Sequence, residues 1–235
     1  MAEKSMIDRS PIRIFERAIG GRLGVGNMGV VLSRQGVGKT AFLIGLAVDQ
    51  LLQGKKVLYI STQESVEHIS DFFEQIFHAM AESLDMDDVA RRQLLMERNR
   101  QIQVYNRKTF SVEKLEQAVG FLEEAMGFSP DMVVMDGTPR FEHSEEWELN
   151  NINELMSKWE AELWVSSSTH REGQEVDDRG VPTDVARFDA QLSVIVNLVP
   201  ENGHTKVVLV KEHNNPEIAK VQLEVDPSTM LLRWR

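Results

Sequence analysis

The stretch V-V-L-S-R-Q-G-V-G-K-T, residues 30–40, decides the fold that we expect for this chain. An apolar run leads into a short loop with two glycines, the loop ends in Gly38-Lys39-Thr40, and a helical pattern follows at once. A strand, a loop and a helix in this order are typical of a P-loop, in which backbone N–H groups and the helix N-terminus surround phosphate oxygens. The stretch therefore predicts a nucleotide site beside a buried strand.

Two side chains of this loop have specific expected roles. Lys39 would contact the β- and γ-phosphates of ATP, and the Thr40 hydroxyl would ligate Mg²⁺. The pattern G-x-x-x-x-G-K-S/T is broken only at its first position, where Ser33 replaces glycine. A chance match is the alternative, although the strand and helix patterns around the loop argue against it. The other residues expected to line the nucleotide site are Ser33, Arg34, Gln35, Gly36, Val37 and Gly38.

The composition bounds the class of protein. The 235 residues are 42% apolar and 27% charged, which fits one large α/β domain over residues 1–235. There is no cysteine, which excludes disulfides, thiolate zinc sites and a cysteine nucleophile. The first nine residues lack the apolar segment of a signal peptide, and no apolar run approaches the ~20 residues needed to cross a membrane. We therefore expect a cytoplasmic protein without membrane contact.

The formal net charge of −11 argues against a surface that attracts nucleic acid over its whole extent. One local basic strip is present, formed by Arg91, Arg92 and residues 98–100. It lies in a highly charged segment, residues 85–100, whose simpler interpretation is a solvated helix and whose alternative is a partner surface. Nucleic acid is accordingly a less favoured partner.

Strand and helix patterns alternate through most of the chain, which is typical of a mostly parallel sheet covered on both faces. Strands are predicted at residues 29–32, 56–61, 102–105, 132–136 and 163–167. Between them, apolar side chains recur at helical spacing, and we interpret these stripes as core packing. Their members are Val66, Ile69, Phe72, Phe73, Ile76, Phe77 and Met80, then Val112, Leu115, Val119, Leu122 and Met126, and later Ile152, Leu155, Met156, Trp159 and Leu163.

The pattern changes towards the C-terminus. Three short β-like runs, residues 192–198, 206–211 and 218–225, are separated by turn signals at residues 200–203 and 214–216. We expect these runs to add antiparallel strands to one side of the parallel sheet.

A P-loop requires a second metal anchor, which is an acidic residue at the end of a neighbouring strand. The run M-V-V-M-D, residues 132–136, is an apolar strand that ends in a carboxylate. Because ligands collect outside the carboxyl ends of parallel strands, we expect Asp136 close to Thr40, holding Mg²⁺ directly or through water. The alternative is that Asp136 only opens the turn that follows.

Taken in order along the chain, these features resemble the RecA-like ATPases, especially the KaiC-type clock ATPases and the core of DnaB-type replicative helicases. Besides the P-loop and Asp136, the resemblance is carried by residues 20–28, 61–65, 167–171, 179–185 and 211–216. It implies a three-layer RecA-like fold with ATP bound between the subunits of a homo-oligomer, for which a hexamer is favoured. It also implies that hydrolysis drives a conformational change used by a protein partner.

In that family the second strand ends in a catalytic glutamate, and in the clock ATPases in a pair of glutamates. This chain has Gln63 at the first position and Glu64 at the second. Glutamine cannot accept a proton as a general base, although it can orient a water molecule. The expected catalytic pair is thus Glu64 with Gln63, and hydrolysis could pass to Glu64, be slow, or be absent.

The resemblance also implies that Lys211 and His213 act on the ATP of a neighbouring subunit. Lys211 keeps the family's lysine, whereas His213 stands where arginine is usual. A trans-acting arginine contributes roughly 10³–10⁵ in rate. A histidine has fewer donors and is charged only near or below its pKa. The alternative for both residues is a solvated turn between edge strands.

Three functions follow from these observations. The leading one is a Mg²⁺-dependent, RecA-like ATPase that works slowly as an oligomer. The second is a regulatory module that binds ATP without hydrolysing it, which Gln63 and His213 favour. The third is a DNA-stimulated motor or recombination accessory, which rests on analogy of fold alone and which the acidic charge disfavours.

Overall fold

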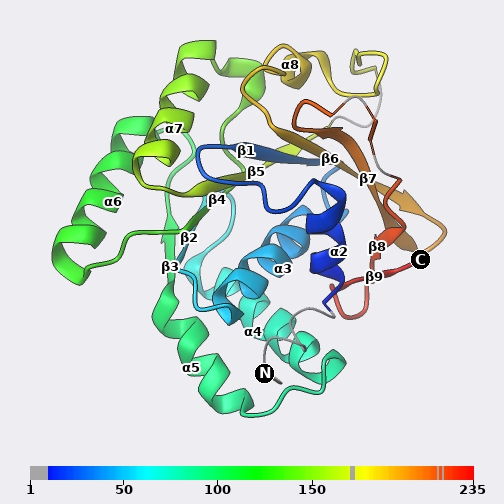
Figure 1. The fold of residues 1–235 in the computed structure, drawn as a ribbon. Helices are drawn as coiled ribbons and strands as arrows, with labels where there is room; N and C mark the ends of the chain where they lie inside the picture. Colours follow the sequence, from blue (N-terminus) through cyan, green and yellow to red (C-terminus); the bar gives the residue numbers. More distant parts are fainter. Residues whose placement is uncertain (1–9, 170–172, 216, 219) are drawn as a thin grey trace.

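The computed structural model describes residues 10–169, 173–215, 217–218 and 220–235. His170, Arg171 and Pro216, which belong to stretches that carry the family resemblance, lie outside the described residues, as does the segment 1–9. The described strands form one nine-stranded sheet in the order β3-β2-β4-β5-β1-β6-β7-β8-β9 (Figure 1).

Six neighbouring strands of this sheet are parallel, and the last three strands of the chain are antiparallel to their neighbours. The parallel strands are β1 (Met28–Ser33), β2 (Val57–Ser61), β3 (Arg100–Val104), β4 (Met132–Asp136), β5 (Glu162–Ser168) and β6 (Val194–Glu201). The antiparallel strands are β7 (His204–Glu212), β8 (Leu223–Val225) and β9 (Leu232–Trp234). We call the side where the parallel strands finish the carboxyl end of the sheet, and the opposite side the amino end.

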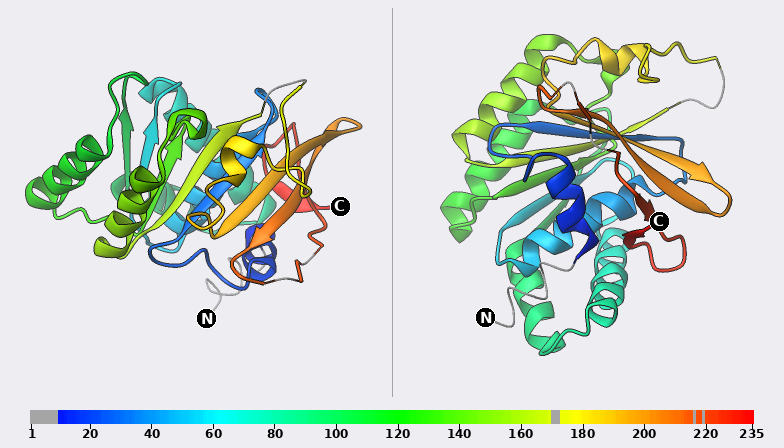
Figure 2. Two further views of the ribbon diagram at one scale, coloured as in Figure 1. Left: turned by 90° about the horizontal axis from the view of Figure 1, so that it is seen from above. Right: turned by 45° about the vertical axis from the view of Figure 1, so that its right-hand side comes forward.

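Helices cover both faces of the sheet, because its central strands are apolar on both sides and must be shielded from water on both (Figures 1 and 2). One face carries α2 (Pro11–Ala18), α3 (Lys39–Leu52), α4 (Val66–Ser83) and α5 (Val89–Asn99). The other carries α6 (Val112–Met126), the 3-10 turn η1 (Phe141–His143), α7 (Glu146–Lys158) and α8 (Thr183–Ala186). This arrangement is compatible with the expected three-layer fold.

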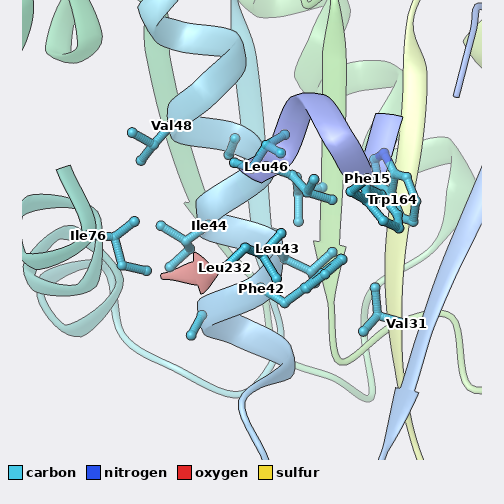
Figure 3. Close-up of a cluster of buried hydrophobic side chains, with 14 of the residues drawn as sticks. Phe15, Val31, Phe42, Leu43, Ile44, Leu46, Val48, Ile76, Trp164 and Leu232 are labelled. Carbon is cyan, nitrogen blue, oxygen red and sulfur yellow. The ribbon is translucent and has the colours of Figure 1, made fainter. Parts of the chain in front are cut away.

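The helix that follows the P-loop, α3, is the centre of one core. Nearly all of its residues are buried, because α2, α4 and the sheet surround it (Figure 3). Phe42 packs edge-to-face on Phe15, with ring centroids 5.4 Å apart, and Phe15 also contacts Trp164. The Trp164 ring lies over Gly29, where an added Cβ would come within 2.7 Å of it. The strand that leads into the P-loop is therefore fixed by close packing.

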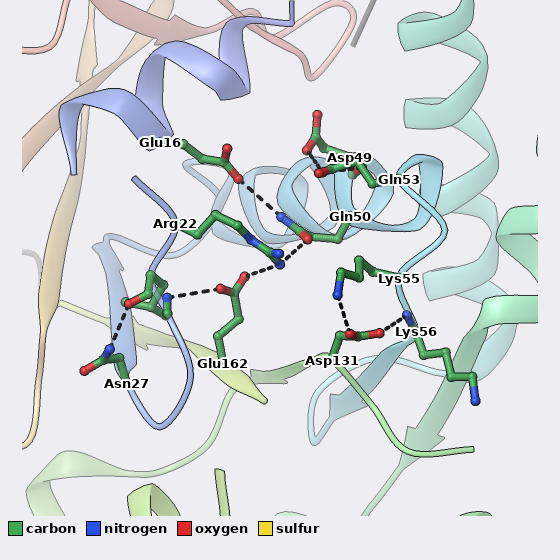
Figure 4. Close-up of polar contacts among 12 residues, drawn as sticks. Glu16, Arg22, Asn27, Asp49, Gln50, Gln53, Lys55, Lys56, Asp131 and Glu162 are labelled. Carbon is green, nitrogen blue, oxygen red and sulfur yellow. Dashed lines mark hydrogen bonds and ion pairs between the residues drawn. The ribbon is translucent and has the colours of Figure 1, made fainter. Parts of the chain in front are cut away.

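A polar cluster lies at the amino end of the sheet, between α2, α3 and the start of β5, and its members Asp49, Gln50 and Glu162 are buried (Figure 4). We call it the amino-end cluster, and its members are Arg13, Glu16, Arg22, Asp49, Gln50 and Glu162. Arg13 forms ion pairs with Glu16 and Asp49, and Arg22 bonds Gln50 and lies 3.6 Å from Glu162. These contacts fix α2 and the loop before β1 to the core.

The predicted parallel strands are all confirmed, with boundaries that differ by at most two residues. The expectation that the three C-terminal runs are all antiparallel is wrong for the first, because β6 runs parallel to β1. Leu163, which was assigned to both a strand and a helical stripe, belongs to β5. Val66 and Met126 are exposed rather than packed, because each lies at the terminal residue of its helix.

Within the residues that the structure describes, we find no helix that combines the length and the apolar character needed to span a membrane.

Candidate functional site

The loop between β1 and α3, residues 34–38, lies at the carboxyl end of the sheet. Two of its glycines adopt left-handed backbone angles, with φ of 78° at Gly36 and 113° at Gly38, the residue that precedes α3. Side chains other than glycine rarely adopt these angles, which explains the spacing of the two glycines. An added Cβ at either position would meet nothing within 4 Å, so the loop backbone borders open space. A ligand at the start of α3 would therefore have room to approach the loop backbone.

Lys39, the first residue of α3, is 8% exposed, and its ammonium group bonds to the residues that open this loop. Its Nζ donates to the carbonyl oxygens of Ser33 and Arg34, each at 3.2 Å, and approaches the Ser33 hydroxyl at 3.4 Å. Burial lowers the pKa of Lys39, and the nearby Asp136 carboxylate opposes this shift. The backbone carbonyls of Ser33 and Arg34 thus hold the ammonium group of Lys39, and a rotation of the side chain could bring that group to a phosphate bound at the loop.

Asp136, the last residue of β4, is 3% exposed and lies beside the start of α3. The Thr40 hydroxyl donates to its Oδ2 at 2.7 Å, although the two residues are 96 positions apart. Oδ2 also accepts from the Tyr59 hydroxyl at 3.0 Å, and Oδ1 accepts from Ser166 at 2.5 Å. The structure therefore brings together the two residues predicted as metal anchors. We call Lys39, Thr40, Tyr59, Asp136 and Ser166 the carboxyl-end cluster.

Gln63 and Glu64 follow β2 and reach the same end of the sheet. Their backbone N–H groups donate to the Ser61 hydroxyl at 3.2 and 3.0 Å, which fixes the turn after the strand. The Gln63 side chain lies directly on Gly137, where an added Cβ would come within 2.3 Å of Gln63 Nε2. Glu64 is partly exposed, with one oxygen 3.7 Å from Nε2 of His68. Both side chains border the P-loop cleft without a mutual contact.

The P-loop forms one wall of a cleft of about 750 Å³, a volume within the usual range for small-molecule sites. Gln63, Glu64 and Asp136 lie at one side of this cleft, and the β6–β7 hairpin, residues 200–205, lies at the other. The hairpin contacts the loop directly, because the Thr205 hydroxyl donates to the Val37 carbonyl at 3.2 Å. The cleft is completed by Phe72, Val225, Asp226, Pro227 and Met230.

Lys211 and His213 are not part of this cleft. Lys211 pairs with Ile195 near the start of β6, and the His213 N–H donates to Ser193 beside the first residue of β1. Both residues therefore lie at the amino end of the sheet, away from the P-loop of their own chain. Lys211 Nζ forms an ion pair with Asp189 at 2.7 Å. Any action of these residues on a nucleotide would have to involve another copy of the chain.

The basic strip expected on residues 91–100 is partly engaged within the chain. The guanidinium of Arg100 lies 4.7 Å from the centre of the Phe73 ring, and the residue is partly buried. Arg92 Nε donates to the Asp87 carbonyl at 3.0 Å. The segment forms the helix α5, as its simpler interpretation predicted, and buries Met96.

The donor set at the carboxyl end fits Mg²⁺ better than a softer metal. Thr40 and Asp136 offer oxygen ligands, which Mg²⁺ prefers, together with the oxygens of a bound phosphate. Among the described residues, no group of three or more histidines, cysteines or acidic residues is placed to hold a metal. A magnesium ion at Thr40 and Asp136 would thus depend on phosphate oxygens to complete its coordination, as is usual for this ion.

The sequence pattern did not identify Tyr59 and Ser166 as part of the site, and it predicted the turn at residues 200–203 without its position at the cleft. Tyr59 lies in an apolar strand and Ser166 in a run of three serines, so neither differs from ordinary strand residues. His204 also lines the cleft, and its Nε2 lies 3.3 Å from a carboxylate oxygen of the buried Glu224.

Comparisons of this chain with protein-family models and with curated proteins gave no match.

Proposed function

We propose that this chain is a RecA-like P-loop protein that binds Mg²⁺·ATP at the carboxyl end of its sheet. The observation that carries the proposal is the 2.7 Å contact between Thr40 and Asp136. A P-loop sequence can arise by chance, but this contact joins the loop to an acidic strand end that is distant in sequence. It lies in a cleft whose backbone and lysine are arranged for an anion.

Each residue of the site has a role in this proposal. The N–H groups of residues 34–38 and the start of α3 would bind the phosphates, and Lys39 would leave its carbonyl partners for the β- and γ-phosphates. Thr40 would ligate Mg²⁺, and Asp136 would hold the ion directly or through water. When bound, the ion would neutralise phosphate charge during transfer of the γ-phosphoryl group.

We propose that the chain hydrolyses ATP slowly. Gln63 lies where the family has its glutamate and can only orient a water molecule, and Glu64 is partly exposed beside His68. These positions also favour a second candidate, a regulatory module that holds ATP and scarcely hydrolyses it. Steady-state turnover at high protein concentration separates the two, since the module predicts none above background.

We further propose that the protein works as a homo-oligomer, with a hexamer favoured, and transmits its nucleotide state to a protein partner in the cytoplasm. Lys211 and His213 lie at the amino end of the sheet and do not line the P-loop cleft of their own chain, so within this proposal they could act only on a nucleotide bound by another copy. A DNA-stimulated motor is disfavoured by the net charge of −11 and by the contacts that Arg92 of α5 and Arg100 of β3 make within the chain.

The test is titration of the chain with a fluorescent, non-hydrolysable ATP analogue in the presence of Mg²⁺. Lys39→Ala should weaken binding about 10- to 100-fold, because charge-assisted hydrogen bonds contribute about 1.5–3 kcal/mol. Lys158→Ala is the matched control, since it removes an exposed lysine paired with Glu116 on the opposite face of the sheet. Equal binding by the wild type and Lys39→Ala would contradict the proposal.

A further inference from the structure

The carboxylate of Asp136 is held by three hydroxyl groups that come from three different elements. Thr40 comes from α3, Tyr59 from β2 and Ser166 from β5, at 2.7, 3.0 and 2.5 Å from the carboxylate oxygens. Only Thr40 belongs to the P-loop motif. The other two hydroxyls are buried with the carboxylate, since Tyr59 is 0% and Ser166 2% exposed. A buried carboxylate with this many donors has a single favoured orientation.

The two additional donors are themselves fixed in place. The Tyr59 ring packs edge-to-face on Phe73, with centroids 5.5 Å apart. Burial, and secondarily the Asp136 carboxylate, raise the pKa of Tyr59 well above its ordinary value, so its hydroxyl keeps its proton. The Ser166 hydroxyl accepts from the Gly137 N–H at 2.9 Å and can therefore direct its own proton to Asp136. Neither side chain lines the P-loop cleft itself.

The contact between Asp136 and Thr40 has a consequence for metal binding. A hydroxyl has one donor and two acceptor lone pairs. The Thr40 proton is used by Asp136, so the lone pairs of its oxygen are left for a cation in the cleft. The orientation of Asp136 thus sets the orientation of Thr40, and Tyr59 and Ser166 set the orientation of Asp136.

We propose that Tyr59 and Ser166 are positioning residues for the metal, acting through Asp136 on Thr40. This inference rests on the proposed function of the same cleft. Groups that orient metal ligands commonly affect metal affinity by about 10- to 100-fold although they never touch the ion. Tyr59 and Ser166 should therefore affect the magnesium dependence of nucleotide binding and leave metal-free binding unchanged.

The experiment uses Tyr59→Phe and Ser166→Ala in the full chain, with a non-hydrolysable ATP analogue as the probe. Binding is measured in EDTA and over a range of Mg²⁺ concentrations. For each variant, the Mg²⁺ concentration that gives half of the metal-dependent gain in affinity should rise by about tenfold. Affinity in EDTA should stay within about twofold of wild type, because the phosphate-binding loop and Lys39 are intact.

Two matched controls distinguish positioning from a general loss of packing. Tyr105→Phe removes a hydroxyl that bonds Gln103, and Ser144→Ala removes a buried hydroxyl that bonds the Arg140 carbonyl. Both controls should keep the wild-type magnesium dependence. Should Tyr59→Phe, which conserves the ring, also keep it, the inference is overturned while the proposed function stands. If the wild type binds no analogue with or without Mg²⁺, the proposed function itself fails.

Discussion

The two ends of the sheet carry buried polar clusters of similar size but different construction. The amino-end cluster contains three carboxylates, two guanidinium groups and an amide, joined to one another by ion pairs and hydrogen bonds. The carboxyl-end cluster contains one carboxylate and one ammonium group, and its other members are hydroxyls. Only the carboxyl-end cluster borders the P-loop cleft, through Lys39, Thr40 and Asp136. The first cluster fixes α2 to the core, whereas under the proposed function the second would exchange internal contacts for contacts with a ligand.

The largest effect on stability is expected at the amino end. Asp49→Ala removes a carboxylate that is 2% exposed and pairs with the 15% exposed Arg13, and losing one member of a buried pair costs about 3–5 kcal/mol. We expect the free energy of unfolding, measured with urea, to fall by about 3 kcal/mol because Glu16 still pairs with Arg13. Lys158→Ala, which breaks an exposed pair, should change it by less than about 1 kcal/mol. A loss for Asp49→Ala as small as this control would show that the cluster does not stabilise the fold.

The larger effect at the carboxyl end is expected on ligand binding. Asp136→Asn keeps the shape of the side chain but turns one acceptor oxygen into a donor, so at least one of the three hydroxyls loses its acceptor and the free energy of unfolding should fall by about 1–3 kcal/mol. Mg²⁺ should increase the affinity of the variant for the ATP analogue at least about tenfold less than it does for the wild type. In EDTA, the variant and the wild type should bind the analogue equally. The measurements are urea unfolding and the same titrations with Mg²⁺ and with EDTA. Unchanged magnesium dependence would remove Asp136 from the metal site.

The pH dependence of the free energy of unfolding tests the role of Glu162 in the amino-end cluster. Burial raises the pKa of Glu162, with Arg22 opposing, so the folded chain binds more protons than the unfolded chain above about pH 4.5. This contribution to stability is present at low pH and is lost as pH rises through the raised pKa. Glu162→Gln lacks this titration and should gain stability relative to wild type between pH 4 and pH 7, measured by urea unfolding. A difference between the two proteins that is independent of pH would contradict the assignment.

The smallest effect is expected for Lys211→Ala on nucleotide affinity. Because Lys211 pairs with Asp189 at the amino end, the affinity of the isolated chain for the ATP analogue should stay within about twofold of wild type. The ATP turnover of Lys211→Ala should fall below that of the wild type only at protein concentrations at which copies of the chain assemble. Titrations and rates at two protein concentrations test this, and a reduced rate in dilute monomer would place Lys211 in its own site.

The parallel strands, the P-loop and the proximity of Asp136 to Thr40 could be predicted from the sequence. The P-loop is a local motif, and Asp136 ends an apolar strand, so parallel-sheet geometry alone brings the two together. The direction of β6 could not be predicted, because a short β-like run has the same pattern in either direction. Its parallel course depends on the crossover through α8 and on pairing with β1.

The remaining site residues depend on contacts across the sheet. Tyr59 and Ser166 face Asp136 because β2 and β5 flank β4. The order of strands in the sheet cannot be predicted from the local sequence of any one strand. The hairpin at residues 200–205 was predicted as a turn, but its position over the P-loop follows from β6 lying beside β1. The role of Lys211 was inferred from the family resemblance. Its location at the amino end of the sheet follows from the antiparallel direction of β7.

Hydrogen exchange of the full chain with and without the Mg²⁺-bound, non-hydrolysable ATP analogue tests the central claim most directly. Peptides that cover residues 34–43 and the amino-end cluster, residues 11–24, report on the two ends of the sheet in one measurement. At saturating analogue, the account predicts strong protection of the P-loop amides and unchanged exchange at residues 11–24. Unchanged P-loop exchange, or equal protection at both ends, would contradict it.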